Sequence, residues 1–278
     1  MHDQSHDLLT LQNTAVLIED SGSISANEYA QQLAKKLGVQ VHTISKANKN
    51  KRFESAQWLL VFTENGLALR VASEPSWSDI RVDFASSALQ FRKLHGGGRN
   101  ELIAKAIGIK GQANWHVLDC TAGMGTDSFV MASVGAKVTM IERSPIISEL
   151  LADALMRATD LGIDVANNMA LLQSNAIDYL NSHADTAHNI DVLYLDPMFP
   201  HKKKSALVKK EMQAFQLLLG PDQDSEALLT AAVNFAPKRI VVKRPASAPV
   251  LDNKQGILPT MALSSKKHRF DVYLLTNK

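Results

Sequence analysis

Hydrophobic positions in the larger, C-terminal part of the chain alternate between short apolar runs and longer stretches with helical spacing. Short apolar runs are typical of strands buried in a parallel sheet, whereas apolar positions three and four residues apart indicate helices. The predicted strands are 116–118, 137–141, 169–173, 191–195 and 238–242, and the predicted helices are 128–134, 146–159, 176–180, 205–219 and 225–235. This order predicts an α/β fold with a mostly parallel, doubly wound sheet.

Two further apolar runs, at 257–263 and 270–275, end the chain with no helical stretch between them. Consecutive strands that are not separated by a helix can pair only in antiparallel fashion. The sequence therefore predicts an antiparallel edge to the sheet.

The N-terminal part has a different pattern, which predicts a small α+β domain over residues 1–79 before a catalytic domain over residues 80–278. Asn65-Gly66 lies between two apolar runs, which is a strong signal for a β-hairpin. Ser25 and Glu28 have the spacing of a capping box and predict a helix that ends at Gly38. The other expected elements are strands at 14–20, 39–44 and 80–84 and a helix at 100–107. We expect a structural or substrate-docking role for this domain, since it contains no catalytic constellation.

A glycine loop containing Gly123 and Gly125 follows the first strand of the predicted sheet, which ends at Asp119. Glycines allow a tight turn and a close approach of the backbone to a ligand. The second strand ends at Glu142, where an acidic residue binds ribose hydroxyls in nucleotide-binding α/β folds. Ser128 replaces the third glycine of a dinucleotide motif, and the chain has no P-loop. The pattern is similar to the S-adenosylmethionine site of Rossmann-like class I methyltransferases; the alternative is a glycine turn in another α/β protein.

The fourth strand is followed directly by Asp196-Pro-Met-Phe-Pro200. Ligands of open α/β sheets bind beyond the carboxyl ends of the strands, so Asp196 is expected to face the same crevice as the glycine loop. This turn resembles the Asp/Asn-Pro-Pro-aromatic motif of methyltransferases that act on exocyclic amines of bases. Such an amine is a poor nucleophile, and a carboxylate that accepts its N–H bond favours the positive charge that develops on the nitrogen during attack. Pro197 constrains the turn, and Phe199 is placed to stack on an unstacked base. Methyltransferases acting on base amines often have a second proline where this chain has Met198.

Composition limits the class of protein. The chain has 278 residues, of which 45% are hydrophobic, and this is enough for one large domain or for one domain with a small companion. No apolar run reaches the length of a membrane span, and the N-terminus has no features of a signal peptide. The single cysteine, Cys120, excludes an internal disulfide and a cysteine metal cluster. We expect a cytoplasmic protein with no membrane partner and no metal.

Basic residues are clustered although the net charge is only +2. Five lysines lie close together after Phe199, and a second group follows the penultimate predicted strand; these residues are Lys202, Lys203, Lys204, Lys209, Lys210, Lys266, Lys267, His268 and Arg269. Such clusters can bind a phosphate backbone, but many are only solvated surface. Arg99 follows three successive glycines, whose exposed amides attract anions.

Five segments of the chain together closely resemble the ribosomal RNA small subunit methyltransferase J family. They are Asp119–Asp127, His95–Arg99, Asp196–Met212, Val242–Pro245 and His268–Asp271. The resemblance extends from about residue 80 to the C-terminus, and its most specific part is the long run that begins at Asp196. It implies transfer of a methyl group from S-adenosylmethionine to N2 of a guanosine in 16S rRNA of the small ribosomal subunit.

Carried over by position, the resemblance implies a set of cofactor contacts around the carboxyl ends of the strands. They are Thr126, Asp127, Glu142, Arg143, Ser174, Asn175 and Asp196, in addition to Asp119, Gly123 and Gly125 of the glycine loop. Arginine is frequent in the family where Thr126 stands, and serine where Asn175 stands. Contacts at these two positions are therefore expected through the backbone.

The resemblance also favours an RNA-binding role for several basic residues. Arg99, Phe199, Lys202, Lys203, Lys204, Lys243 and Arg244 are the expected substrate-binding residues. The chemistry of Asp196 and Phe199 alone leaves open a methyltransferase of DNA adenine or cytosine, or of another RNA amine. A different class of function, an rRNA-binding assembly factor without catalytic activity, also stays open, although such a factor would not need Asp196, Phe199 and Glu142.

Overall fold

The computed structural model describes residues 11–19, 24–44, 56–109, 115–198, 210–219 and 224–275. The chain divides into two compact units, each built from separate stretches of sequence. The first unit comprises Met1–Asp83, Ser144–Arg157 and Lys204–Gly220, and the second comprises Phe84–Arg143, Ala158–Lys203 and Pro221–Lys278. Whether residues 1–79 and 80–278 are separate folding domains stays a prediction.

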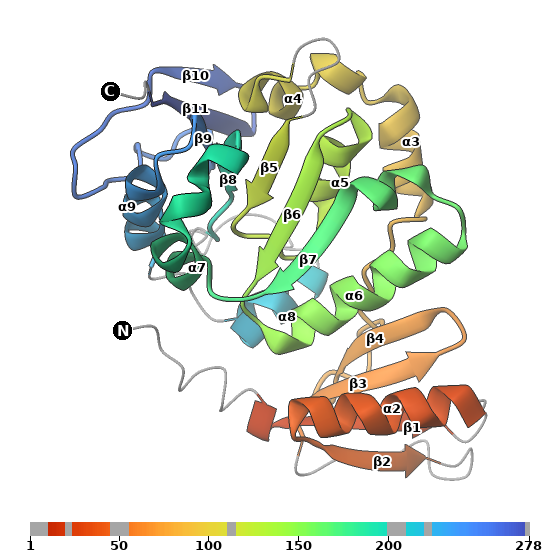
Figure 1. The fold of residues 1–278 in the computed structure, drawn as a ribbon. Coiled ribbons are helices and arrows are strands. Elements are labelled where there is room, and N and C mark those ends of the chain that lie inside the picture. Colours follow the sequence, from red (N-terminus) through yellow and green to blue (C-terminus); the bar gives the residue numbers. More distant parts are fainter. Residues whose placement is uncertain are drawn as a thin grey trace. The chain divides into compact units, whose positions relative to one another are not determined.

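The first unit contains a four-stranded sheet in the order β2-β1-β3-β4, together with one helix of the N-terminal segment (Figure 1). Its elements are β1 (Thr14–Glu19), α2 (Ile24–Leu37), β2 (Gln40–Ile44), β3 (Trp58–Thr63) and β4 (Gly66–Val71). Strand β1 is parallel to β2 and β3, and β3 and β4 form the antiparallel hairpin predicted at Asn65-Gly66.

Two details of the N-terminal prediction are wrong. Helix α2 begins at Ile24, so Ser25 lies inside the helix and is not its N-cap. The predicted strand at 80–84 is reduced to a single bridge between Ile80 and Leu69. The apolar residues of this segment, Val82 and Phe84, are buried without belonging to a sheet, which explains the strand-like pattern.

The first unit also contains α8 (Lys210–Leu219) and most of α6 (Pro145–Asp160). Two acidic side chains of α6 are buried there and are paired with cations. Glu149 contacts Lys36 of α2 at 2.5 Å, and Asp153 contacts Arg157 at 2.8 Å. Arg157 also donates to the carbonyl oxygen of Val82. Buried carboxylates are costly unless paired, so these contacts hold α6 to the N-terminal segment.

The second unit is built on a seven-stranded sheet in the order β10-β11-β9-β8-β5-β6-β7 (Figure 1). The strands are β5 (His116–Asp119), β6 (Lys137–Glu142), β7 (Met169–Gln173), β8 (Val192–Leu195), β9 (Arg239–Pro245), β10 (Met261–Ser264) and β11 (His268–Leu274). Strands β5 to β9 are mutually parallel, whereas β11 is antiparallel to β9 and to β10. The predicted α/β fold, a Rossmann-like sheet with an antiparallel edge, is confirmed.

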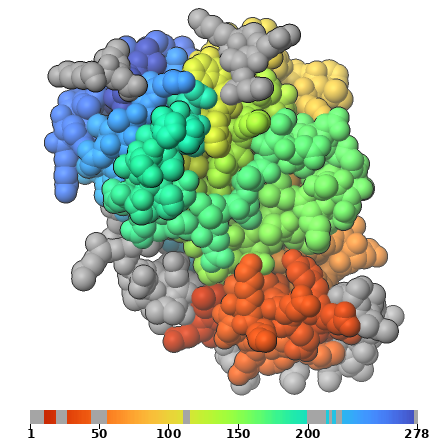
Figure 2. Space-filling view, in the orientation of Figure 1, coloured from red at the N-terminus to blue at the C-terminus, as the bar shows by residue number. Residues whose placement is uncertain are grey.

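Helices lie on both faces of this sheet. They are α3 (Ser87–His95), α4 (Leu102–Ile107), α5 (Thr126–Ser133), α7 (Ala176–Ser182) and α9 (Ser225–Phe235), with short 3-10 turns η2 (Gly98–Asn100), η3 (Asp164–Asn168) and η4 (Ala184–Asn189). One face packs against α7 and α9 through a buried core that includes Leu118, Leu193, Ile240, Leu180 and Leu229. The space-filling view shows one face of the surface that these elements form (Figure 2).

Side chains alternate between the two faces along each strand. Because Leu118, Leu193 and Val242 belong to the core with α7 and α9, their neighbours Asp119, Tyr194 and Lys243 point to the opposite face. Helix α5 lies on that face, since Asp127 and Ser128 in its first turn bond to these strands. Within the described ranges, no helix combines the length and apolarity that a membrane span requires.

Candidate functional site

Register brings the candidate catalytic residues together at the carboxyl ends of the central strands. Asp119 pairs with Tyr194 across β5 and β8, and Leu195 pairs with Val242 across β8 and β9. One residue further along this register, Asp196 lies opposite Lys243. Residues level with one another on parallel strands point to the same face, so Asp196 and Lys243 project together toward α5.

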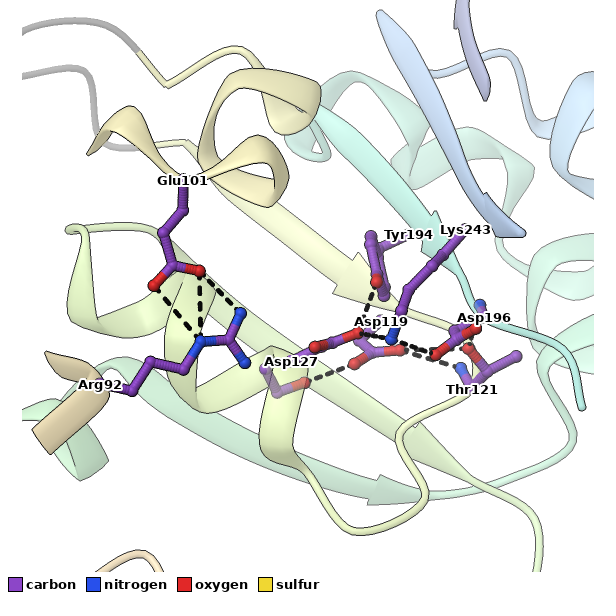
Figure 3. Close-up of polar contacts among 9 residues, drawn as sticks. Arg92, Glu101, Asp119, Thr121, Asp127, Tyr194, Asp196 and Lys243 are labelled. Carbon is purple, nitrogen blue, oxygen red and sulfur yellow. Dashed lines mark hydrogen bonds and ion pairs between the residues drawn. The ribbon is translucent and has the colours of Figure 1, made fainter. Parts of the chain in front are cut away.

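Lys243 connects two carboxylates (Figure 3). Its Nζ lies 2.7 Å from an oxygen of Asp127 and 2.7 Å from an oxygen of Asp196. The Tyr194 hydroxyl donates to the same Asp127 oxygen at 2.6 Å. The result is a continuous polar chain from Tyr194 through Asp127 and Lys243 to Asp196, at the edge where an α/β sheet binds its ligands.

The charges of Asp127, Lys243 and Asp196 stabilise one another. Burial alone would lower the pKa of Lys243, but the Asp196 and Asp127 carboxylates raise it above its ordinary value. Burial would likewise raise the pKa of Asp127, but Lys243 and the Tyr194 hydroxyl lower it overall. Burial and then the nearby Asp127 and Asp196 raise the pKa of Tyr194 well above its ordinary value. At neutral pH the Lys243 ammonium therefore lies between the carboxylates of Asp127 and Asp196, and the Tyr194 hydroxyl is neutral.

Asp119 holds the glycine loop from within. Asp119 as a residue is 2% exposed, and its carboxylate accepts hydrogen bonds from the Ser128 hydroxyl at 2.5 Å and from the Thr121 backbone N–H at 3.0 Å. Burial raises the pKa of Asp119 to about 7, although these two hydrogen bonds oppose the shift. Because these bonds join both ends of the loop to β5, we expect Asp119 to act on the cofactor by shaping the loop.

The turn after the fourth strand is fixed by the same loop. The backbone N–H of Asp196 donates to the Thr121 hydroxyl at 2.7 Å. Pro197 is buried next to it. This hydrogen bond joins the loop after β5 to the candidate catalytic turn after β8. The two predicted halves of the site are therefore connected by a backbone N–H bond as well as by Lys243.

Glu142 reaches the glycine loop from the end of β6. Glu142 as a residue is 5% exposed, and its carboxylate accepts a hydrogen bond from the Gly123 N–H at 3.0 Å. Gly123 and Gly125 have φ angles of 53° and 68°, which other residues rarely adopt. A carboxylate beside a glycine turn at this strand end is suited to binding the ribose of a nucleoside, and that role of Glu142 stays a prediction.

The donor and acceptor set fits S-adenosylmethionine. The carboxylates of Glu142 and Asp196 lie at the carboxyl ends of β6 and β8, and that of Asp127 lies in the first turn of α5. Lys243 is paired with two of them, Asp127 and Asp196. Such an acidic site favours a cofactor that carries a positive sulfonium and no phosphate, and it disfavours a dinucleotide pyrophosphate. In the part of the chain that the structure describes, no group of three or more histidine, cysteine, aspartate or glutamate residues could hold a metal ion.

Other predicted cofactor residues have local partners. Arg143 pairs with Asp224 at 3.0 Å, and Asn175 is the N-cap of α7, where its side chain accepts two backbone N–H bonds. Ser174 donates its backbone N–H to the Glu142 carbonyl oxygen, which places it next to Glu142 at the sheet edge. Thr126 is exposed at the start of α5. Their roles toward the cofactor stay predictions.

The predicted substrate residues are not all brought together. Arg244 follows Lys243 but is buried on the opposite face of β9, where its register partner is Arg269. The guanidinium of Arg99 lies 4.0 Å from the Cβ position of Gly135, beyond the C-terminal end of α5, whereas Asp127 is in the first turn. Helix α5 separates Arg99 from Lys243 by roughly 12 Å of helix length. Phe199 and the lysines 202–204 lie outside the described residues.

Sequence reasoning missed three hydroxyl groups. Thr121, Ser128 and Tyr194 hold Asp196, Asp119 and Asp127 respectively. Thr121 and Ser128 flank the glycine loop, between the acidic strand ends Asp119 and Glu142. Their hydroxyl groups were the signal in the sequence that could have identified them as hydrogen-bonding partners of the site. Tyr194 gave no signal, because within an apolar run it could not be told from a core residue.

Cys120 is a packing residue, and its reactivity offers a simple test of the fold. Its side chain is 5% exposed, and burial followed by the nearby Asp119 raises the pKa of its thiol. Since the thiolate is the reactive form, we expect no labelling of the native protein by 5,5′-dithiobis(2-nitrobenzoate) at pH 8 and one equivalent in guanidinium chloride. Cys120 is the only cysteine, so rapid labelling of the native protein would contradict its burial.

Comparison with known proteins agrees with this geometry. The chain matches the family model of SAM-dependent methyltransferases over residues 42–275. A ribosomal RNA small subunit methyltransferase J from Alteromonas mediterranea is 55% identical over 76% of this chain and 80% of the relative. One of the same name from Colwellia psychrerythraea is 44% identical over 89% of each chain. The crystal structure of a SAM-dependent methyltransferase from Neisseria gonorrhoeae covers 95% of this chain and 97% of its own, with 32% identity and a TM-score of 0.67.

The family match and the site agree on cofactor and reaction class: the protein is a methyltransferase that uses S-adenosylmethionine. Similarity to the curated relatives extends over most of both chains. The chain therefore belongs to the ribosomal RNA small subunit methyltransferase J family.

Proposed function

We propose that this protein transfers a methyl group from S-adenosylmethionine to the exocyclic N2 of a guanosine in 16S rRNA of the small ribosomal subunit. The observation that carries the proposal is the position of Asp196: a carboxylate at the carboxyl end of β8, bound to Lys243 and tied by its backbone to the glycine loop. The relatives' name, ribosomal RNA small subunit methyltransferase J, supports the substrate class.

The proposed chemistry assigns one task to each part of the turn. S-adenosylmethionine supplies the electrophilic methyl group. Asp196 accepts an N–H bond of the amine, orients its lone pair, and favours the positive charge that develops on nitrogen during attack. The amine then loses its extra proton, for which the Asp196 carboxylate is the nearest acceptor. Methyl transfer from a sulfonium depends on positioning, so the proposal includes no metal.

The base must leave its stack before its amine can reach Asp196. Single-stranded or extruded bases are read on their edges and stacked on aromatic side chains. Phe199, three residues beyond Asp196, is the proposed stacking residue. Since a ribosomal RNA is the proposed substrate, we also propose a cytoplasmic location.

The decisive experiment is methyl transfer from labelled S-adenosylmethionine to small-subunit rRNA and to small-subunit particles from a strain that lacks the gene. Nucleoside analysis of the product should show N2-methylguanosine with the wild-type protein and none with Asp196→Ala. Methyladenosine or methylcytidine would replace the guanosine proposal with another amine. Cofactor binding without transfer to any RNA would point to a different amine substrate. Absence of cofactor binding as well would favour an rRNA-binding assembly factor without catalytic activity.

The lysines that follow Phe199 are proposed to bind the RNA backbone. Phosphate contacts position a substrate without reading its sequence. We expect the triple variant Lys202→Ala, Lys203→Ala and Lys204→Ala to raise the KM for RNA about tenfold or more at moderate salt, with unchanged affinity for S-adenosylmethionine.

The matched control removes the same charge from three exposed lysines elsewhere, Lys35, Lys137 and Lys254. Steady-state kinetics with RNA as the varied substrate, at two salt concentrations, separates the two variants. Equal RNA kinetics in both would assign residues 202–204 to solvated surface.

A further inference from the structure

Lys243 is held in an unusual position for a residue that was expected to bind RNA. Its side chain is 19% exposed, and its ammonium lies between two carboxylates at 2.7 Å each. A buried ammonium is costly unless it is paired and hydrogen-bonded. Lys243 is therefore committed to partners within the protein, and it cannot leave for a phosphate without exposing the pair Asp127 and Asp196 to each other.

The two carboxylates are held differently. Asp127 belongs to α5, its side chain is 17% exposed, and it also accepts the Tyr194 hydroxyl at 2.6 Å. Asp196 follows the end of β8, and its side chain is 36% exposed. Asp127 is thus held by its helix and by a hydrogen bond to a neighbouring strand, whereas Asp196 is the more exposed of the two partners. Because the Lys243 ammonium contacts both carboxylates, the fixed position of Asp127 also restricts the position of Asp196.

We propose that Lys243 is a positioning residue, which fixes the Asp196 carboxylate in the orientation that receives the target amine. A carboxylate offers about four lone-pair sites, so an ammonium on one oxygen does not exhaust its capacity to accept an N–H bond. The ammonium also favours the ionised form of Asp196, which is the form that accepts the amine. This inference rests on the proposed function and deepens it.

The surroundings of Lys243 support a role in setting charge. Among the described residues, the charged or titratable groups that interact with this cluster, besides Asp127 and Asp196, include Tyr194, Asp119, Arg92 and His268. Arg92 is paired with Glu101 at 2.7 Å. Burial, and next the Lys243 charge, lower the pKa of His268. Within the described residues, Lys243 is thus a cation in direct contact with the Asp196 carboxylate.

The test compares Lys243→Met, which keeps an unbranched side chain one atom shorter and removes the charge, with Lys243→Arg. We expect Lys243→Met to lower kcat about 100-fold, with KM for RNA and Kd for S-adenosylmethionine within about threefold of wild type. In the pH profile of kcat, the acidic limb should move to higher pH. Without the Lys243 ammonium, Asp196 ionises less readily beside the negative charge of Asp127. Lys243→Arg, which keeps a cation, should restore much of kcat.

Lys238→Met is the matched control. Lys238 pairs with Asp191 at 2.6 Å at the start of β9, the opposite end of the strand, and its side chain is 62% exposed. Thermal unfolding of all three variants identifies any loss that comes from folding alone. A tenfold rise in KM for RNA with unchanged kcat would overturn the proposal in favour of direct substrate binding, and unchanged kinetics would leave a purely structural ion pair.

Crystal structures of Lys243→Met and Lys238→Met separate this inference from the proposed function. The Asp196 side chain should change its rotamer in the first and keep it in the second. An unchanged Asp196 in Lys243→Met would overturn the positioning role whatever the substrate is. A displaced Asp196 in a protein that methylates a different base would leave the positioning role intact and change only the proposed substrate.

Discussion

Replacing Asp196 with alanine is expected to lower kcat by about 1,000-fold or more, because the variant loses the carboxylate that orients the amine and stabilises its developing charge. Asp196 is half-exposed at the end of β8 and contributes no core packing, so the protein should stay folded. Asp196→Asn keeps an acceptor oxygen but loses the charge and the ion pair with Lys243. We expect its kcat to lie between those of Asp196→Ala and wild type.

The measurement is single-turnover transfer of a labelled methyl group with RNA and cofactor both saturating, so that binding does not limit the rate. Asp185→Ala, which removes an exposed carboxylate from η4, is the matched control and should have wild-type activity. Wild-type turnover in Asp196→Ala, with normal thermal unfolding, would remove Asp196 from the mechanism.

Glu142→Ala is expected to weaken binding of S-adenosylmethionine by about 30- to 100-fold, which corresponds to about 2–3 kcal/mol for lost hydrogen bonds to a charged acceptor. The variant removes the proposed ribose acceptor and also the carboxylate that holds the Gly123 N–H at 3.0 Å. Both losses act on the cofactor, so the KM for RNA at saturating cofactor should change little.

Isothermal titration with S-adenosylmethionine measures this effect directly. Glu226→Ala removes an exposed carboxylate from the first turn of α9 and serves as the control. Glu142→Gln should fall between Glu142→Ala and wild type, since an amide oxygen can still accept the Gly123 N–H. Equal affinities of Glu142→Ala and Glu226→Ala would place the ribose elsewhere in the crevice.

The strands of the second unit, though not their order in the sheet, could be predicted because they are buried. Strand β8 is apolar throughout, and strands β5, β6 and β9 have apolar segments between polar ends. The same rule failed at residues 80–84, where Val82 and Phe84 are buried in an irregular segment. An apolar pattern indicates burial. It identifies a strand only where the backbone also has hydrogen-bonding partners on a neighbouring strand.

The sequence by itself determined the fold class and the chemical groups of the site. Asp119, Glu142 and Asp196 each follow an apolar run, and the carboxyl ends of parallel strands meet at one edge, so their convergence follows from the order of elements. The glycine loop and the proline turn are local features, whose conformations depend on neighbouring residues.

Only the tertiary structure decided how these groups are held. Lys243 and Arg244 are adjacent and looked equivalent, yet one contacts Asp196 and the other is buried on the far face of β9. That difference depends on the register of β9 against β8 and on the face that α5 covers, and both are set by packing between segments distant in sequence. The pairing of Lys243 with Asp127 and Asp196 joins residues 116 and 47 positions apart, so no local pattern could encode it.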